Sequence, residues 1–401
     1  MTTTMERIRA WQGPALFSYG FRPFFLFGAL YAALLIALWL PWYLGAIALP
    51  SAFAPVTWHV HELLFGYVLA IEAGFLLTAV PNWTGRLPVV GWPLVGLFSL
   101  WLVGRLAVAA SLHLAPAMLV LLTFLFPVTL VALILREVLA AGNSKNLIVV
   151  AAFTASIVAQ ARYQFEFWYQ ADNVIGDRLG IAATLVLIMI IGGRITPSFT
   201  RNWIKKENPG REPVPFGRFD AACLLLGVLA LLAWVSAPYL PAQSLGIVGM
   251  ALLLAAGLHA VRCARWAPDR TLREPLVAVL HAAYAFVPLG FALAGLALLS
   301  PRDVPDVAAM HAWTVGAIAL MTLAVMTRAS RGHTGRPLTA PIRTVLIYGS
   351  ITLAALTRVA AALWPDYAIS QLYLSGFFWC AAFLGFVALY GPMLWAPRGP
   401  R

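Results

Sequence analysis

The fold of this chain is decided by residues 58–80, WHVHELLFGYVLAIEAGFLLTAV. The stretch is long enough to cross a bilayer as a helix, because about 20 apolar residues span the hydrocarbon core. It also holds two histidines and two glutamates, His59, His61, Glu62 and Glu72. Ionisable side chains are costly at that depth, so a group of them predicts a functional site.

Similar apolar runs recur along the whole chain of 401 residues, which is 62% hydrophobic and only 10% charged. The pattern predicts an all-α, polytopic membrane protein, a bundle of about twelve spans with no soluble domain. The expected spans are residues 24–44, 57–80, 92–111, 117–135, 146–168, 178–200, 218–236, 243–261, 275–299, 307–327, 341–363 and 371–395.

The basic residues predict the orientation of these spans. Of the 27 Lys and Arg residues, twenty-one fall in loops on one side, two (Arg178 and Arg302) on the other, and four inside spans. Cytoplasmic loops collect Lys and Arg, so both termini should be cytoplasmic. The larger group includes residues near the two ends, namely Arg7, Arg9, Arg398 and Arg401. The net charge of +12 therefore reflects membrane topology and does not indicate a nucleic-acid partner.

The short loops predict one transmembrane domain over residues 1–401. The alternative is a division into halves 1–206 and 216–401, because twelve-helix proteins often contain two repeats. The Pro-rich loop Arg201–Gly217 would join these halves. The three cysteines form no Cys-x-x-Cys or Cys-x-x-Cys-His motif, which excludes a covalently attached c-type haem.

Six of the seven histidines fall into two groups at opposite faces of the membrane. His59, His61 and His311 lie at span starts on the face opposite the termini, and the cytoplasmic group is His259, His281 and His333. Neutral imidazole ligates copper, iron and zinc, so two groups imply two centres. For any single histidine, a hydrogen-bonded position at the interface is the simpler interpretation.

Haem b needs one or two axial histidines on facing helices. His259 and His281 lie on consecutive antiparallel spans at similar depth, so we expect them to ligate one haem. Arg262 and Arg265 lie in the basic segment between them and are expected to hold the haem propionates. His333 belongs to the same cytoplasmic group.

The second group fits copper or a second haem. His59 and His61 are two residues apart, and such residues point about 200° apart on a regular helix. Either the helix start after Pro55 is irregular or the two histidines serve different centres. Glu62 and Glu72 are expected to carry protons along this span.

Other charges inside spans have plainer interpretations. Arg162 and Glu166 are four residues apart, which predicts an ion pair on one helix or, alternatively, a charge relay. Arg105 lies inside the third expected span. Its charge either compensates a haem propionate or a buried Glu, or is carried to an interface by the long side chain, and we expect the second.

Five stretches resemble the NnrS family. They are residues 21–26 (FRPFFL), 58–62 (WHVHE), 74–86 (GFLLTAVPNWTGR), 192–203 (GGRITPSFTRNW) and 311–336 (HAWTVGAIALMTLAVMTRASRGHTGR). The resemblance implies a twelve-helix protein of the bacterial inner membrane that contains haem and copper. It also implies a role in denitrification and in resistance to nitric oxide.

The leading hypothesis is therefore an oxidoreductase, similar to nitric oxide reductases, that reduces or otherwise detoxifies nitric oxide. This gas is small and soluble in lipid, so a site among helices can receive it. Reduction would also need electrons from a quinol or a redox partner. One alternative is a haem protein that binds nitric oxide protectively without turnover. Another is a transporter for a metal, haem or small anion, although its site would be expected near the midplane.

Overall fold

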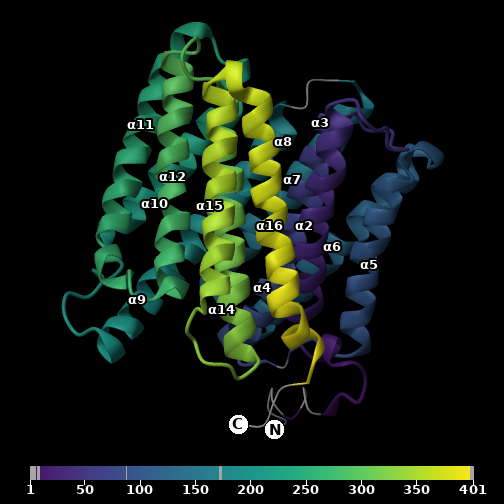
Figure 1. Cartoon of the computed structure of the whole chain (residues 1–401), viewed down its shortest axis with the longest axis vertical. Coiled ribbons are helices and arrows are strands. Elements are labelled where there is room, and N and C mark those ends of the chain that lie inside the picture. The colour runs from purple at the N-terminus through teal and green to yellow at the C-terminus, as the bar shows by residue number, and fades with distance from the viewer. Residues whose placement is uncertain (1–5, 7–9, 87, 171–173, 398–401) are drawn as a thin grey trace. The chain divides into compact units, whose positions relative to one another are not determined.

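The chain is α-helical, as the sequence predicts (Figure 1). The computed structural model describes residues 6, 10–86, 88–170 and 174–397. Within these ranges there is no β-strand, and twelve helices are long and apolar enough to cross a membrane. Arg7, Arg9, Arg398 and Arg401, which contribute to the predicted orientation, lie outside the described residues.

Nine spans are single helices and three are built from consecutive helical segments. The single helices are α2 (Phe21–Tyr43), α5 (Trp92–Ala109), α6 (Pro116–Ala140), α7 (Leu147–Trp168), α10 (Arg218–Ser236), α11 (Ala242–Ala264), α12 (Pro275–Leu299), α15 (Ile342–Leu363) and α16 (Ala368–Trp395). The composite spans are α3 (Pro55–His61), η2 (Glu62–Val68) and α4 (Leu69–Thr84); α8 (Val174–Leu187), η5 (Ile188–Gly192) and α9 (Gly193–Glu207); and α13 (Asp306–His311), η8 (Ala312–Ala319) and α14 (Leu320–His333).

The composite spans extend further than hydropathy predicted. The helix of the sixth span runs to Glu207, so Arg201, Lys205 and Lys206 are helical rather than part of a loop, and the connection shrinks to residues 208–217. Lysines in the last turn suit the negative end of a helix, which lets it continue past the apolar residues. Likewise Arg178 lies within α8 and His333 ends α14, whereas both were expected in loops.

Proline and glycine set several helix boundaries. Pro55, Pro116 and Pro275 begin α3, α6 and α12, where a missing backbone N–H costs nothing. Gly85 ends α4 with φ of 69°, a left-handed conformation that glycine adopts without strain. These residues place the ends of the helices that carry the candidate site.

The middle segments of the three composite spans are π-helical. They lie in the second, sixth and tenth spans, as η2, η5 and η8. Side chains of other helices bond carbonyl groups inside two of them: Trp101 Nε1 donates to Gly66 O at 3.0 Å, and Arg262 Nη1 donates to Met189 O at 3.1 Å. π segments interrupt the regular α-helical ladder and are frequent at functional sites.

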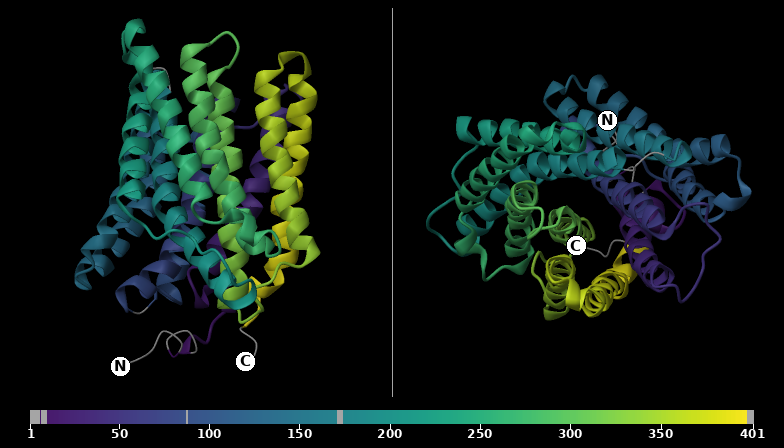
Figure 2. Two further views of the ribbon diagram at one scale, coloured as in Figure 1. Left: turned by 90° about the vertical axis from the view of Figure 1, so that its left-hand side faces the viewer. Right: turned by 90° about the horizontal axis from the view of Figure 1, so that it is seen from above.

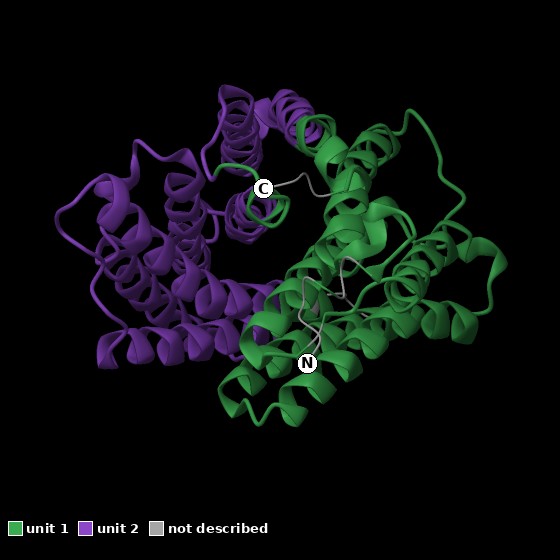
Figure 3. Cartoon of the chain, turned by 90° about the horizontal axis from the view of Figure 1, so that it is seen from below, with its two compact units in different colours: residues 1–180, 329–337, 383–401 green, residues 181–328, 338–382 purple. Residues whose placement is uncertain are grey.

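The chain divides into two compact units, coloured separately in Figure 3. Unit 1 is residues 1–180, 329–337 and 383–401, and unit 2 is residues 181–328 and 338–382. In unit 1, α2 packs on α4 and η2, and α5, α6 and α7 follow as neighbours. In unit 2, α11 packs between α10 and α12 (Figure 2), and α12 also contacts η8. The expected halves 1–206 and 216–401 stay a prediction.

The two ends of the described chain meet within unit 1. Arg22 Nη1, at the start of α2, donates hydrogen bonds to the carbonyl oxygens of Leu394 at 3.0 Å and Ala396 at 2.7 Å. The guanidinium is buried and bonds backbone groups at the C-terminal end of α16. The first and last spans therefore have these ends on the same side of the membrane, as an even number of crossings requires.

Candidate functional site

Glu62 is the centre of a buried polar network in unit 1. Its carboxylate accepts hydrogen bonds from Arg105 Nη1 at 2.6 Å, from His61 Nδ1 at 2.7 Å and from the hydroxyl of Tyr31. Glu62 and His61 have no exposed surface. Since the three donors lie on α5, α3 and α2, several helices converge on one carboxylate.

His61 uses its second ring nitrogen as well. Gln164 Nε2, on α7, lies 3.1 Å from His61 Nε2 and also donates to Thr123 Oγ1 at 2.9 Å. Because an amide NH₂ only donates, His61 Nε2 is the acceptor and Nδ1 carries the proton that bonds Glu62. Both nitrogens of His61 are therefore occupied within the protein.

Gly66 makes this network sterically possible. A Cβ atom added there would lie 2.5 Å from Arg105 Nη1 and 3.3 Å from Glu62 Oε2. Only a residue without a side chain lets the guanidinium approach so closely. Sequence reasoning missed Tyr31, Gly66 and Gln164, although the polar Gln164 inside an apolar span was a usable signal.

Arg105 corrects one expectation. It does not reach an interface, because its side chain is 6% exposed and is paired with Glu62. A buried charge is tolerated when an opposite charge and further hydrogen bonds compensate it. The pairing of Arg162 with Glu166 is confirmed, at 2.7 Å, and Glu166 also accepts a hydrogen bond from Gly176 N.

The histidines expected to form the second centre have different neighbours. His59 stacks on Trp39 with ring centroids 4.0 Å apart, whereas His61 bonds Glu62 and Gln164. His311, in unit 2, bonds Val307 O through Nδ1 at 2.7 Å. This arrangement does not present His59 and His61 to one ion. Among the described residues, no three His, Cys, Asp or Glu side chains are grouped as metal ligands.

Glu72 lies on α4, deeper in the same span than Glu62. Both of its carboxyl oxygens are buried, and neither has a hydrogen-bond partner among the described residues. Such a group differs from Glu62, whose charge is held by three donors. Glu72 can take up or release a proton without breaking an ion pair.

Unit 2 holds a second buried network, centred on His259. The Nδ1 atom of His259 lies 3.0 Å from the hydroxyl of Tyr284, which accepts a hydrogen bond from Arg262 Nη1 at 2.6 Å. The same hydroxyl oxygen can also accept a hydrogen bond from His259 Nδ1–H, and in that tautomer the lone pair of Nε2 is left for a ligand. The histidine and the tyrosine have no exposed surface. Tyr284 thereby fixes the orientation of the imidazole.

Arg262 ties this network together. Its Nε donates to Asp220 Oδ1 at 3.3 Å, and its guanidinium lies 5.2 Å from the ring centre of Trp266. The sequence placed Arg262 in a basic loop, but it lies inside α11 and is 1% exposed. Arg265 follows α11 and is held by a longer ionic contact than Arg262. Its Nη2 lies 3.6 Å from Asp220 Oδ2, and its side chain is 31% exposed.

His281 and His333 are the other two histidines of the group that the sequence predicts on the cytoplasmic side. His281, on α12, bonds the hydroxyl of Thr200 through Nε2 at 2.8 Å, and its Nδ1 is buried with no hydrogen-bond partner among the described residues. His333 belongs to unit 1, where its ring packs against Tyr19 and Phe21. Its membership of a centre with His259 and His281 stays a prediction.

The donor atoms of His259 and His281 suit the expected haem. His281 Nδ1 is buried without a hydrogen bond to any described residue, and His259 Nε2 is buried with the Cys223 backbone as the neighbouring polar group, while a hydroxyl group holds the other nitrogen of each ring. Metal-ligating histidines have this arrangement. A Cβ atom added at Gly227 would lie 2.6 Å from His259 Nε2, so this nitrogen packs closely against the glycine.

The fold and the two networks define a polytopic α-helical membrane protein with histidines anchored inside its spans. A family model, described as NnrS protein, matches residues 15–398. The chain therefore belongs to the NnrS family, and it is a membrane protein of the nitric oxide response. No curated protein matches the chain.

Proposed function

We propose that this protein binds haem b through His259 and His281 and detoxifies nitric oxide by reducing it. The observation that carries the proposal is His259, which is fully buried and fixed at Nδ1 by Tyr284, so that its Nε2 is the nitrogen left to hold a metal. Haem, when bound, supplies a redox-active iron to which nitric oxide binds. A gas that dissolves in lipid reaches a site among helices without a polar channel.

The two arginines expected to hold propionates have different roles in this proposal. Arg262 already bonds Asp220, Met189 O and Tyr284, so it positions the histidine. Arg265 is partly exposed and has one distant carboxylate contact, so it is the better propionate partner. Hydrogen bonds between an arginine and a propionate are charge-assisted and directional.

Protons for the reduction are assigned to Glu72 rather than to Glu62. The carboxylate of Glu62 is held by Arg105, His61 and Tyr31, so it serves as a fixed anion. Glu72 has no such partner and is free to exchange a proton. Electrons would come from a quinol or another redox partner in the bacterial inner membrane. A copper or second haem centre at His59, His61 and His311 stays an expectation to which we assign no step.

The first test is an optical spectrum of the purified, reduced protein before and after nitric oxide is added, with haem and copper per chain measured in parallel. Stoichiometric haem, bands that shift with nitric oxide, and recovery as the gas is consumed are the expected result. A shift without consumption would leave the protective, non-catalytic alternative, and protein without haem would overturn the proposal.

A matched pair of glycine variants tests the haem assignment at His259. Gly227→Ala places a methyl group against His259 Nε2 and should abolish haem binding at that nitrogen. Gly257→Ala, on α11, has no heavy atom within 4 Å of the added Cβ and should retain full haem. If both variants fold and contain equal amounts of haem, His259 is not a haem ligand.

Transport is an alternative function that the same residues support less well than haem binding. Transporters commonly form their sites from discontinuous helices near the midplane. The second, sixth and tenth spans contain π segments, but each continues as a helix on both sides of its π segment. This continuity favours a fixed site over a gated one. A metal that washes out and alternates between the two faces would support transport instead.

A further inference from the structure

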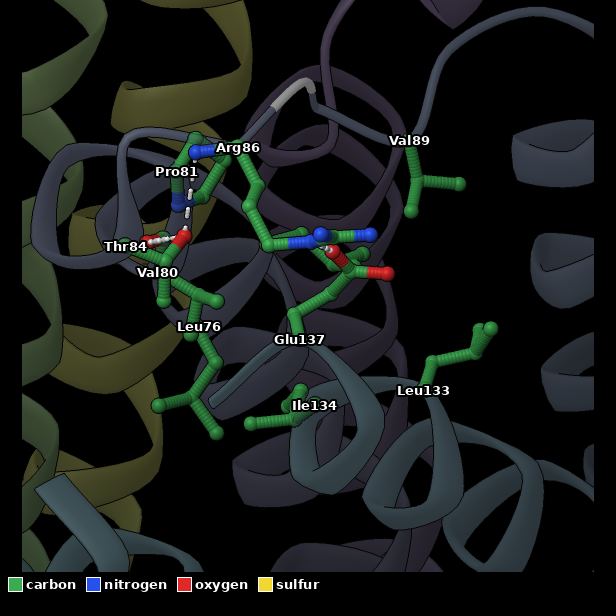
Figure 4. Close-up of a pocket in the computed structure, with 10 residues that line it drawn as sticks. Leu76, Val80, Pro81, Thr84, Arg86, Val89, Leu133, Ile134 and Glu137 are labelled. Atoms are coloured by element: carbon green, nitrogen blue, oxygen red, sulfur yellow. Dashed lines mark hydrogen bonds and ion pairs between the residues drawn. The ribbon is translucent and has the colours of Figure 1, made fainter. Parts of the chain in front are cut away.

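A narrow pocket lies in unit 1 between the C-terminal ends of α4 and α6 (Figure 4). It has about 320 Å³ of empty space, part of which is open to the outside. One wall is formed by Leu76, Val80 and neighbouring residues of α4, and the other by Leu133 and Ile134 of α6. None of the histidines or glutamates of the networks described above lines this pocket.

The pocket has an ionic mouth. Glu137 accepts a hydrogen bond from Arg86 Nε at one carboxyl oxygen and bonds from Arg136 Nε and Nη2 at the other. Two guanidinium groups thus face one carboxylate, which leaves a net positive charge. The side chains of Arg86 and Arg136 are 45% and 65% exposed, respectively. Neither Nη1 nor Nη2 of Arg86, nor Nη1 of Arg136, is used in the hydrogen bonds to Glu137.

The mouth lies at a defined end of the spans. Because consecutive spans alternate in direction, α4 ends on the side where α2 begins, which is also where Arg22 bonds the end of α16. The excess of Lys and Arg marks this side as cytoplasmic. The cytoplasmic leaflet carries anionic lipids, which basic pockets between helix ends bind.

We propose that this pocket binds an anionic phospholipid, with its phosphate at Arg86 and Arg136 and one acyl chain along the apolar walls. The mostly aliphatic walls, open on one side, can pack against a hydrocarbon chain, and the net positive mouth complements a phosphate. The uncharged ring of a quinone gains nothing from that charge. The site goes beyond the nitric oxide chemistry and does not depend on it.

Native mass spectrometry of the full chain in detergent tests this site, with dioleoyl phosphatidylglycerol and dioleoyl phosphatidylcholine as probes. The double variant Arg86→Gln/Arg136→Gln should weaken phosphatidylglycerol binding about 30-fold. Arg343→Gln, an exposed arginine of α15, removes charge elsewhere and should have no effect. Glu137→Gln frees both guanidinium groups and should strengthen binding.

A second pair of variants tests the acyl-chain position. Leu133→Trp fills the pocket and should reduce phosphatidylglycerol binding, whereas Leu135→Trp, on the exposed side of α6, should not. Equal affinity for the two headgroups, or equal losses in the double variant and Arg343→Gln, would overturn the proposal. Displacement of phosphatidylglycerol by a short-chain ubiquinone would overturn it in favour of a quinone site.

Discussion

Arg105 Nη1 donates a hydrogen bond to Glu62 Oε1 across 2.6 Å, and both side chains are buried. The pair joins α5 to the first residue of the π segment η2. On the same segment, Trp101 of α5 bonds the carbonyl oxygen of Gly66. Two side chains of α5, one turn apart, thus hold the irregular start of the second span in place.

Arg105→Gln should lower the free energy of unfolding by about 3–5 kcal/mol, because it leaves Glu62 as an uncompensated buried charge. Denaturant unfolding in micelles measures the change. The double variant Arg105→Gln/Glu62→Gln should recover most of the loss, since neither charge remains. Arg302→Gln, at an exposed position, should stay within about 0.5 kcal/mol of the parent. A loss of that small size in Arg105→Gln would contradict a structural role for the pair.

Tyr284→Phe should reduce haem affinity about 10–100-fold, the usual effect of removing a hydrogen bond to a ligating histidine. The variant leaves His259 Nδ1 without the hydroxyl that lies 3.0 Å away. Haem titration of the apoprotein provides the readout, independent of turnover. Tyr163→Phe removes a buried hydroxyl that bonds Thr57 O in unit 1, and it should retain the parent affinity. Identical haem affinity in the two variants would argue against His259 as a ligand.

Glu72→Leu should separate stability from activity. The variant removes two buried carboxyl oxygens that have no hydrogen-bond partner among the described residues, so the protein should gain about 1–3 kcal/mol of stability. If Glu72 carries protons, nitric oxide consumption should fall while haem content stays unchanged. The matched change Glu62→Leu should instead lower stability, because Arg105 loses its partner. Full consumption by a stabilised Glu72→Leu protein would exclude the proton role.

The exposed pair of Arg211 and Asp269 predicts a pH effect outside the spans. The hydrogen bond from Arg211 holds the pKa of Asp269 below its ordinary value of 3.8. Its contribution to stability is therefore present above that ordinary value and is lost as the pH falls through the lowered pKa. Arg211→Gln should return the pKa of Asp269 towards its ordinary value, as measured by the ¹³C shift of the carboxyl group. High salt should shrink the difference, because both groups are exposed. If the pKa of Asp269 is the same in both proteins, Arg211 is not the cause of its lowered pKa.

The sequence alone determined the number of spans and the family. Apolar runs of bilayer length and the one-sided distribution of Lys and Arg are local patterns, and each follows from the cost of placing polar groups in hydrocarbon. Hydropathy failed at the ends of α9 and α14, because a helix continues on its backbone hydrogen bonds after the apolar residues stop. The ion pair of Arg162 with Glu166 was also predictable, since both residues lie on one helix.

Only the tertiary structure decided which polar groups meet. Arg105 was expected at an interface and instead pairs with Glu62, 43 positions away in the chain, and Tyr31 reaches the same carboxylate from α2. Tyr284 and Arg262 meet His259 because α11 and α12 pack side by side. A sequence places a charge at a depth in the membrane, but its partner depends on helix rotation and on π segments. Those are set by the packing of whole helices, and no local pattern encodes them.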